Sequence, residues 1–369
     1  MIRLPALLAA LTLATPLAAE TLRVATFDVG LGRDGPGLLL HELSTGPKPD
    51  ALAVAALIRA ADPDVLLMTG FDHDAGGQAL DAFRALLGQG GAIAGYPHAF
   101  AAAGNAGVPS GRDLDGDGRT AGPRDAIGWG RFPGHGGMAI LSRLPIDADA
   151  VRSFTTLPWT ALPGSDPPER ARAAGLRLSS KAHWDVPLML PSGGRLHLLA
   201  SAPTPPLFDG PDGMNRRRNR DEIRLWSLYL DGTPLPDDQG RTAPAANAPA
   251  VVVGNLNLDP RDGAGERSAI AALLGHPRLN DPLPASPGAE AAAGSGANGG
   301  HAGDPRLDTA DFDDDSGGPG NLRLDYVLPT RDLTVEAAGV VWPAPGTALA
   351  DESAAASRHR LVWADLALP

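Results

Sequence analysis

The sequence has no cysteine, few aromatic residues and very little lysine. Aromatic side chains make up 5% of the 369 residues, and Lys48 and Lys181 are the only lysines. Without cysteine, disulfide bonds, thiolate zinc ligands and thiol nucleophiles are excluded. The sequence also lacks an apolar run of the roughly 18 residues that a transmembrane helix needs, so we expect no membrane span.

Positive charge is also scarce. The formal net charge is −12 and the pI is about 5.1. Neutralising DNA or RNA phosphates requires a basic face, so we expect no strong nucleic-acid-binding surface. The charge does not exclude a metal-dependent enzyme acting on phosphate esters, because the metal then supplies the positive charge. We expect a monomer that does not associate with membranes.

Glycine and proline are abundant, with 46 and 36 residues, and they predict long loops over a compact centre. Short runs rich in Val, Leu and Ile predict strands at 22–29, 65–69, 138–142, 184–190, 195–201, 251–257, 324–328 and 360–366. Apolar periodicity predicts helices at 51–61, 78–87, 218–230 and 267–274. This pattern favours one α/β domain over residues 20–369, in which two mixed β-sheets pack together with helices outside.

The first residues have the pattern of a secretory signal peptide. Arg3 precedes an apolar run over 4–17, and the small pair Ala18 and Ala19 comes directly before Glu20. The alternative is a buried first helix. We interpret residues 1–19 as a signal peptide and expect a periplasmic or secreted protein.

Short motifs along the chain resemble those of the endonuclease/exonuclease/phosphatase superfamily, which has the DNase I-like fold. They occur in family order at 21–29 (TLRVATFDV), 64–70 (DVLLMTG), 137–143 (GMAILSR), 253–257 (VGNLN), 323–328 (RLDYVL) and 357–362 (SRHRLV). The resemblance implies a four-layered α/β sandwich whose active site lies at one edge of the two sheets. It also implies hydrolysis of phosphate mono- or diesters with Mg²⁺ or Ca²⁺ as cofactor.

The resemblance assigns roles to the residues that match it. His359 corresponds to the imidazole of the family's last motif, and Asp325 to the carboxylate that holds it. Asn257 corresponds to a phosphate-binding amide and Asn255 to the residue beside the attacking water. Asp28 corresponds to a metal ligand of the first strand.

Several positions depart from the family pattern. Gly70 stands where the family has a glutamate ligand, and Ala202 stands where a histidine is expected. Asn255 replaces an aspartate and cannot accept a proton. Arg358 places a cation at a metal-ligand position. A positioned acid or base contributes roughly 10²–10⁴-fold to a rate, so these losses predict weakened catalysis.

Two groups of acidic residues offer other metal ligands. Asp72 and Asp74 follow Gly70 and, with Asp28, would rebuild a carboxylate site; alternatively, they are solvated loop residues. Asp113, Asp115 and Asp117 form the first half of a calcium loop of the EF-hand type, although the bidentate glutamate of its last position is missing. A plain acidic turn is the alternative.

Four further residues are candidates for substrate binding. Ser142 and Arg143 end the third motif. Arg216 and Arg217 begin the helix predicted over 218–230, in a stretch that also resembles a secreted bacterial branch of the superfamily. Guanidinium groups at a helix start are suited to phosphate binding.

The sequence therefore favours a metal-dependent phosphoric ester hydrolase with weakened catalysis. The alternative is a non-catalytic secreted protein that binds calcium or another ligand on the same scaffold. Gly70, Ala202, Asn255 and Arg358 favour the alternative, whereas Asn257, Asp325 and His359 favour the hydrolase.

The signal-peptide interpretation gives a direct prediction. Protein recovered from the periplasm or the medium should begin near Glu20, because a signal peptidase cleaves after a small-residue pair. Intact-mass analysis of the exported protein measures the N-terminus. Recovery of a chain that retains Met1 would contradict the prediction.

Overall fold

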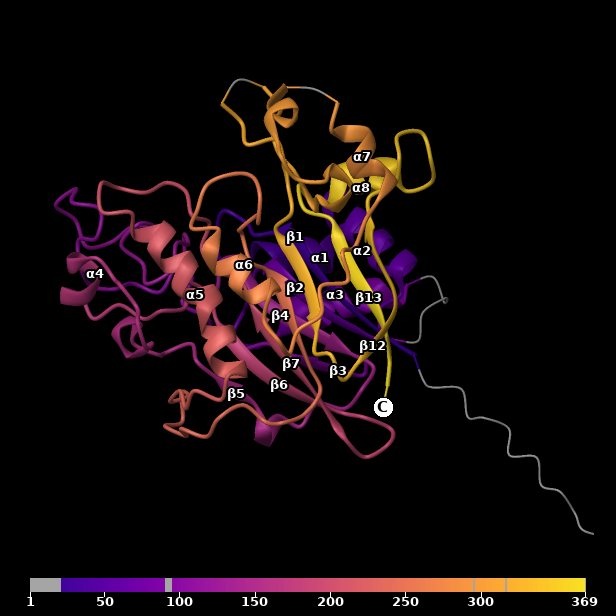
Figure 1. The fold of residues 1–369 in the computed structure, drawn as a ribbon. Coiled ribbons are helices and arrows are strands. Elements are labelled where there is room, and N and C mark those ends of the chain that lie inside the picture. The colour runs from indigo at the N-terminus through magenta and orange to yellow at the C-terminus, as the bar shows by residue number, and fades with distance from the viewer. Residues whose placement is uncertain (1–20, 90–94, 295, 316, 369) are drawn as a thin grey trace, which may run out of the picture.

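The computed structural model describes residues 21–89, 95–294, 296–315 and 317–368. The predicted signal peptide lies outside these residues. Two mixed sheets pack face to face at the centre, with helices on their outer faces (Figure 1). This is the four-layered α/β sandwich that the sequence predicted.

The first sheet has six strands in the order β12-β13-β1-β2-β4-β3. Its strands are β1 (Thr21–Leu31), β2 (Val65–Phe71), β3 (His98–Phe100), β4 (Gly137–Ser142), β12 (Thr334–Val341) and β13 (Leu361–Ala367). β1 runs parallel to β2 and antiparallel to β13. The end of β1, the end of β2 and the start of β13 therefore meet at one edge.

The second sheet has five strands in the order β11-β8-β7-β6-β5. Its strands are β5 (Arg152–Ser153), β6 (His183–Met189), β7 (Arg195–Ser201), β8 (Ala250–Asn255) and β11 (Asp325–Pro329). A separate two-stranded ribbon joins β9 (Ala310–Asp311) to β10 (Asn321–Leu322). β7 and β8 are parallel, whereas β11 is antiparallel to β8. The end of β8 and the start of β11 thus lie at the same edge.

The α-helices are α1 (Leu38–Thr45), α2 (Pro49–Ala61), α3 (Gln78–Gly88), α4 (Glu169–Ala173), α5 (Met214–Leu230), α6 (Ser268–Leu274), α7 (Pro287–Ala292) and α8 (Ala350–Ala356). Four short 3₁₀ turns are Ala148–Ala150, Trp159–Ala161, Gly296–Gly300 and Pro305–Leu307. None of the described helices is long and apolar enough to cross a membrane.

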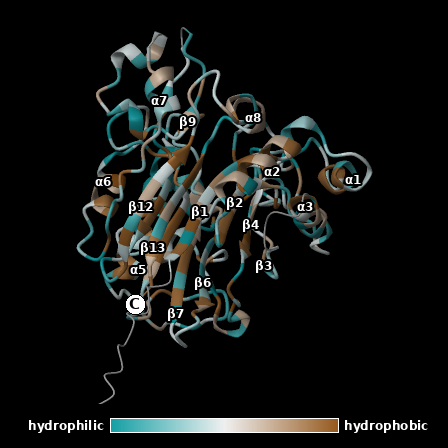
Figure 2. Cartoon of the chain, turned by 90° about the vertical axis from the view of Figure 1, so that its right-hand side faces the viewer, coloured by the Kyte–Doolittle hydropathy of each residue, from teal (hydrophilic) through white to brown (hydrophobic). Residues whose placement is uncertain are grey.

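Three apolar layers hold the sandwich together. Alternate residues of both sheets, such as Val24, Ile140, Trp184 and Val253, are buried against one another between the sheets. The other face of the first sheet packs under α1, α2, α3 and α8, and the other face of the second packs under α5 and α6. Apolar residues accordingly concentrate along the strands (Figure 2). Strands buried on both faces explain the continuous apolar runs in the sequence.

All eight predicted strands and all four predicted helices are present, with boundaries shifted by a few residues. The sequence patterns missed β3, β5, β9, β10 and β12, as well as α1, α4, α7 and α8. The missed strands are two or three residues long, except β12, most of whose residues are partly or fully exposed. The long loops that glycine and proline predicted include α4 and α7, since short helices offer too few turns for periodicity to show.

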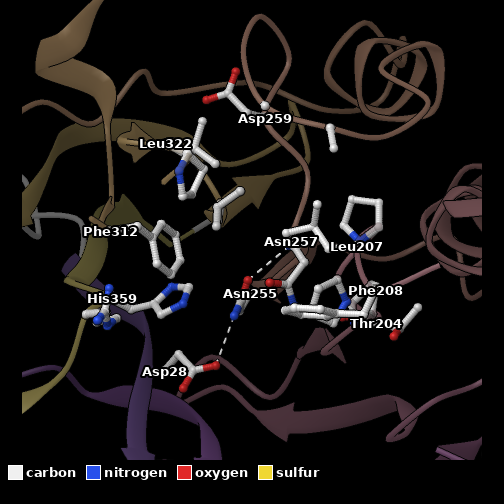
Figure 3. Close-up of a pocket in the computed structure, with 18 of the residues that line it drawn as sticks. Asp28, Thr204, Leu207, Phe208, Asn255, Asn257, Asp259, Phe312, Leu322 and His359 are labelled. Atoms are coloured by element: carbon white, nitrogen blue, oxygen red, sulfur yellow. Dashed lines mark hydrogen bonds between the residues drawn. The ribbon is translucent and has the colours of Figure 1, made fainter. Parts of the chain in front are cut away.

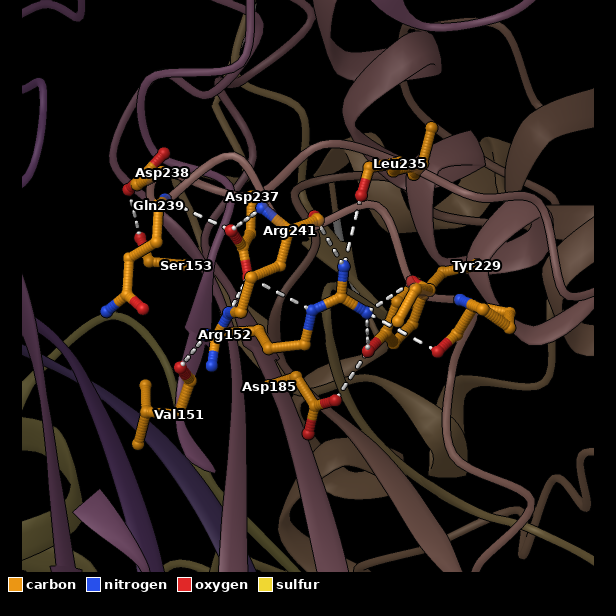
Figure 4. A network of polar contacts seen from close by, with 12 residues as sticks. Val151, Arg152, Ser153, Asp185, Tyr229, Leu235, Asp237, Asp238, Gln239 and Arg241 are labelled. Carbon is orange, nitrogen blue, oxygen red and sulfur yellow. Dashed lines mark hydrogen bonds and ion pairs between the residues drawn. The ribbon is translucent and has the colours of Figure 1, made fainter. Parts of the chain in front are cut away.

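A buried arginine fixes the long connection between α5 and β8 (Figure 4). Arg152 of β5 donates from Nε to Asp237 Oδ2 at 3.2 Å and from Nη1 to the Tyr229 hydroxyl at 3.1 Å. It also donates to the backbone carbonyls of Leu235 and Ala243. The guanidinium group thereby satisfies carbonyls that no strand pairs.

Replacing this arginine should destabilise the protein strongly. Arg152→Ala leaves the buried carboxylate of Asp237 without one of its partners, and we expect a loss of about 3 kcal/mol or more in the free energy of unfolding. Urea denaturation measures the loss. Arg195→Ala is the control, because Arg195 pairs with Asp147 in an exposed ion pair worth below about 1 kcal/mol. Equal losses in the two variants would refute this account of Arg152.

Candidate functional site

A cavity of about 480 Å³ opens at the edge where β1, β2 and β8 end and where β11 and β13 begin (Figure 3). Its polar lining residues include Asp28, Lys181, Asn255, Asn257 and His359. The two sheets therefore bring together residues that lie more than three hundred positions apart in the sequence. These are the residues that the motifs singled out, with the addition of Lys181.

A chain of side-chain amides joins the two sheets inside the cavity (Figure 3). Asn255 of β8 donates from Nδ2 to Asp28 Oδ2 of β1 at 2.9 Å. Asn255 Oδ1 accepts the backbone N–H of Asn257 at 3.0 Å, and Asn257 Nδ2 donates to Pro203 O at 2.8 Å. Asn257 has a φ of 54°, a conformation that asparagine adopts more readily than most residues. The backbone of the turn after β8 therefore holds the two asparagine side chains in position.

His359 and Asp325 form a buried pair beside the amides. His359 Nδ1 lies 2.8 Å from Asp325 Oδ2, which also accepts the Thr309 hydroxyl at 2.9 Å. The ring of Phe312 packs edge-on against the imidazole, with 5.7 Å between centroids. Since Nδ1 carries the proton donated to Asp325, Nε2 is the ring nitrogen left for the cavity.

Charge around the cavity shifts the pKa of each of these groups. Burial lowers the pKa of His359, but the carboxylates of Asp325 and Asp28 raise it by more, so the pKa of His359 lies above its usual value. Burial would raise the pKa of Asp28, but His359, Lys181 and the hydrogen bond from Asn255 lower it below its usual value. Burial lowers the pKa of Lys181, partly offset by Asp28, Asp72 and Glu222.

The end of β2 leaves no room for a metal-binding side chain. A Cβ atom added to Gly70 would lie 2.3 Å from Asp28 Oδ1, and Gly70 has a φ of +69°, which strains any other residue. A side chain at position 70 would therefore require the Asp28 carboxylate to turn away. No side chain at the end of β2 therefore takes the place of the glutamate ligand that the resemblance expects at position 70.

The inner cavity does not fit a divalent cation. Mg²⁺ and Ca²⁺ require several oxygen ligands, mostly anionic. Asp28 Oδ2 is already hydrogen-bonded to Asn255, and Lys181 and His359 interact electrostatically with the same carboxylate. A metal beside Asp28 would face the cationic groups of Lys181 and His359. The other nearby carboxylate, that of Asp325, is buried and already bonded through Oδ2 to His359 and Thr309.

Asp72 and Asp74 do not line the cavity. Both carboxylates accept hydrogen bonds from backbone N–H groups instead. Asp72 accepts the N–H groups of Gly136 at 2.7 Å and Arg33 at 2.8 Å. Asp74 accepts two N–H groups of the first turn of α3, those of Gln78 and Ala79, each at 2.9 Å. The structure therefore does not bring them together with Asp28 as a ligand set.

The four predicted substrate-binding residues also lie elsewhere. Ser142 pairs with Val65 at the start of β2, the end opposite to Asp28, and its hydroxyl donates to Leu144 O at 2.8 Å. Arg143 forms ion pairs with Asp62 and Asp64. Arg217 pairs with Asp166 at the start of α5, and Arg216 neighbours it outside the cavity lining.

Arg358 and Ala202, two of the departures from the family pattern, lie in different surroundings. Arg358 lines the cavity rim and pairs with Asp313, with 3.2 Å between Nη1 and Oδ1. Ala202 is buried in the layer between the sheets. Ala202 thus has no polar side-chain group to offer, and Arg358 places a guanidinium group at the cavity rim, not a metal ligand.

Asp113, Asp115 and Asp117 form an exposed cluster in the loop 104–136. One carboxylate oxygen from each lies within 4.8 Å of the others. Asp113 also accepts the N–H groups of Gly116 and Gly118, which curls the loop around the cluster. Three hard oxygen donors at this spacing fit Ca²⁺. None of the three lines the cavity.

Sequence analysis missed three residues of the site. Lys181 lines the cavity, Thr309 holds Asp325, and Phe312 covers His359. Thr309 and Phe312 lie in a Gly/Asp-rich stretch with no recognisable pattern. The rarity of lysine was a signal that could have drawn attention to Lys181.

Apolar side chains form one rim of the cavity. Leu207 and Phe208, in the loop after β7, are 41% and 88% exposed, and Trp129 is 56% exposed. Phe208 has a φ of 58°, an unfavourable conformation for a bulky residue. The rim therefore presents apolar surface next to the polar inner wall.

Comparison with known proteins gives a consistent result. The model of the Endonuclease/Exonuclease/phosphatase family matches residues 25–359. A structure described as an endonuclease/exonuclease/phosphatase from Beutenbergia cavernae is 20% identical, with a TM-score of 0.55 over 94% of this chain and 72% of that one. A family protein from Leptotrichia buccalis is 13% identical, with a TM-score of 0.50 over 94% and 100%. No curated protein matches the chain.

The acidic cluster yields a testable prediction. If Asp113, Asp115 and Asp117 bind calcium, Ca²⁺ at ten times its Kd should stabilise the protein by about 1.4 kcal/mol and raise Tm by about 2 °C. Asp115→Ala should remove most of the rise, as measured by thermal unfolding with and without Ca²⁺. Asp149→Ala, which removes an exposed carboxylate elsewhere, is the control. A calcium response unchanged in Asp115→Ala would place the binding outside this cluster.

Proposed function

Because the chain belongs to the endonuclease/exonuclease/phosphatase family, we propose that it binds phosphate mono- or diesters in the cavity and hydrolyses them with weakened catalysis. The observation that supports this most directly is the His359–Asp325 pair next to Asn255 and Asn257. An oriented imidazole and two amides are suited to a phosphoryl group.

The proposed chemistry follows from the protonation of His359. Its raised pKa favours the imidazolium form, which donates a proton or a hydrogen bond from Nε2 to a phosphoryl or leaving-group oxygen. Asp325 stabilises that form and fixes the ring. Asn255 cannot accept a proton from water, so the hydrolysis that we propose lacks one acid–base group and should be slow.

Family members generally depend on a divalent metal, and Mg²⁺ or Ca²⁺ is the cofactor that the resemblance implies. The residues of the inner cavity do not fit such an ion. We propose that calcium binds at Asp113, Asp115 and Asp117 instead, where three carboxylates converge. We also propose that the protein is exported to the periplasm or the medium, where calcium is available.

A second candidate is a non-catalytic protein that binds calcium or a phosphate-containing ligand. The contacts of Asn255 and Arg358 favour it, because the amide is hydrogen-bonded to Asp28 and the guanidinium is paired with Asp313. A bound ligand would meet the same inner wall in either case. Turnover separates the two candidates.

The test uses purified mature protein with bis(4-nitrophenyl) phosphate and 4-nitrophenyl phosphate. We expect slow hydrolysis, and His359→Ala should lower kcat/KM by about 10²-fold or more, because it removes the proton donor. His41→Ala, an exposed histidine of α1, should leave the rate unchanged.

Hydrolysis that is unaffected by His359→Ala would contradict the proposed role of the pair. Binding of phosphate without any turnover would favour the non-catalytic candidate.

A further inference from the structure

The side chain of Lys181 extends toward Gly70, near the end of β2, where the chain has no side chain of its own. A Cβ atom added to Gly136 would lie 3.5 Å from Lys181 Nζ and 3.8 Å from Gly70 Cα. The same construction at Gly70 meets Asp28 Oδ1. The ammonium of Lys181 and the carboxylate of Asp28 therefore approach Gly70 from two directions, and both line the cavity.

Two buried carboxylates hold the backbone around Lys181. Glu222 of α5 accepts the hydroxyl of Ser180 at 2.7 Å and the N–H of Thr204 at 2.8 Å. Asp72 accepts the N–H of Gly136, whose carbonyl oxygen in turn accepts a hydrogen bond from Lys181 Nζ. The long and normally flexible lysine side chain is thus fixed at its base and at its tip.

The other acidic residues that line the cavity are engaged elsewhere. Asp259 accepts the N–H groups of Arg261, Asp262 and Arg323, and Asp262 accepts those of Ala302 and Gly303. Asp313 pairs with Arg358 at the rim. On the inner wall, the charged groups are Asp28, Lys181 and His359.

We propose, building on the phosphate-ester function above, that the ammonium of Lys181 replaces the divalent cation in this cavity, so that the site binds a phosphate group without metal. Within the described chain, Gly136 O accepts one of the three ammonium N–H groups, and two remain for phosphate oxygens. His359 Nε2 is directed at the same cavity. A lysine is a compact cation of the kind that binds phosphate as a point charge.

The arrangement accounts for two of the departures from the family pattern, Gly70 and Asn255. Gly70 leaves space for the Asp28 carboxylate, which supplies a counter-charge for Lys181 while the site is empty. Asn255 holds that carboxylate through a neutral amide. A second carboxylate at position 255 or at position 70 would instead cancel the positive charge that binds the ligand.

The first experiment uses the unaltered protein. Because Lys48 and Lys181 are the only lysines, ¹⁵N-lysine labelling gives two side-chain ammonium signals, and Lys48→Arg assigns them. Inorganic phosphate added in the presence of EDTA should shift the Lys181 signal, and Mg²⁺ without phosphate should not. Phosphate binding that appears only when Mg²⁺ is present, or a shift of Lys181 with Mg²⁺ alone, would overturn the proposal.

The second experiment compares variants by calorimetric titration with inorganic phosphate in EDTA. Lys181→Met removes the charge at similar volume and should weaken binding about 10- to 100-fold, the loss expected for a hydrogen bond to a charged group. Lys181→Arg should recover part of it. Lys48→Met, which removes the exposed lysine paired with Glu42, should bind as the unaltered protein does.

The outcomes separate this proposal from the proposed function. Metal-free phosphate binding that depends on Lys181, with no ester hydrolysis, would support the inference and reject the hydrolase. Unchanged phosphate binding in Lys181→Met would overturn the inference even if esters are hydrolysed, and Lys181 would then be a structural partner of Asp28. Absence of phosphate binding with and without Mg²⁺ would also overturn it.

Discussion

The hydrogen bond between Asp28 and Asn255 is the contact on which the cavity depends. It joins Asp28, near the end of β1 in one sheet, to the last residue of β8 in the other. The apolar layer between the sheets fixes their separation, and this polar contact closes the layer at the edge. The side chains that follow β8 and precede β13 then converge on one small volume. Packing of the two sheets aligns the strands. The side chains of Asn255 and Asp28 then determine which polar groups face the cavity.

The site combines an oriented imidazole with an unusual set of charged side chains. Asp325 orients the imidazole of His359, supported by the buried Thr309 and the partly buried Phe312. The opposite wall is provided by Lys181, which Glu222 and Asp72 position indirectly through the backbone. We propose that Lys181 supplies the positive charge of this cavity, in a family whose members generally depend on a divalent metal. The acidic cluster in the loop 104–136 is a separate feature with its own ligand chemistry.

Sequence patterns predicted the sheets well, because continuous Val, Leu and Ile runs mark strands buried on both faces. They also identified Asp28, Asn255, Asn257, Asp325 and His359, which stand in recognisable motifs. Asp72 and Asp74 show the limit of such reasoning: a carboxylate near a strand end caps a helix or a turn as readily as it binds a cation. Lys181 was missed because its position depends on the hydrogen bond to Gly136 O and on the contact of the neighbouring Ser180 with Glu222, which are distant in the sequence.

The crowding between Asp28 and position 70 has a consequence for restoring a glutamate at that position. A Cβ atom at position 70 would lie 2.3 Å from Asp28 Oδ1, so the Asp28 carboxylate would have to turn away. That movement would disturb the hydrogen bond from Asn255 and the counter-charge of Lys181. A substitution at position 70 is therefore coupled to the conformation of Asp28 and, through it, to both sheets.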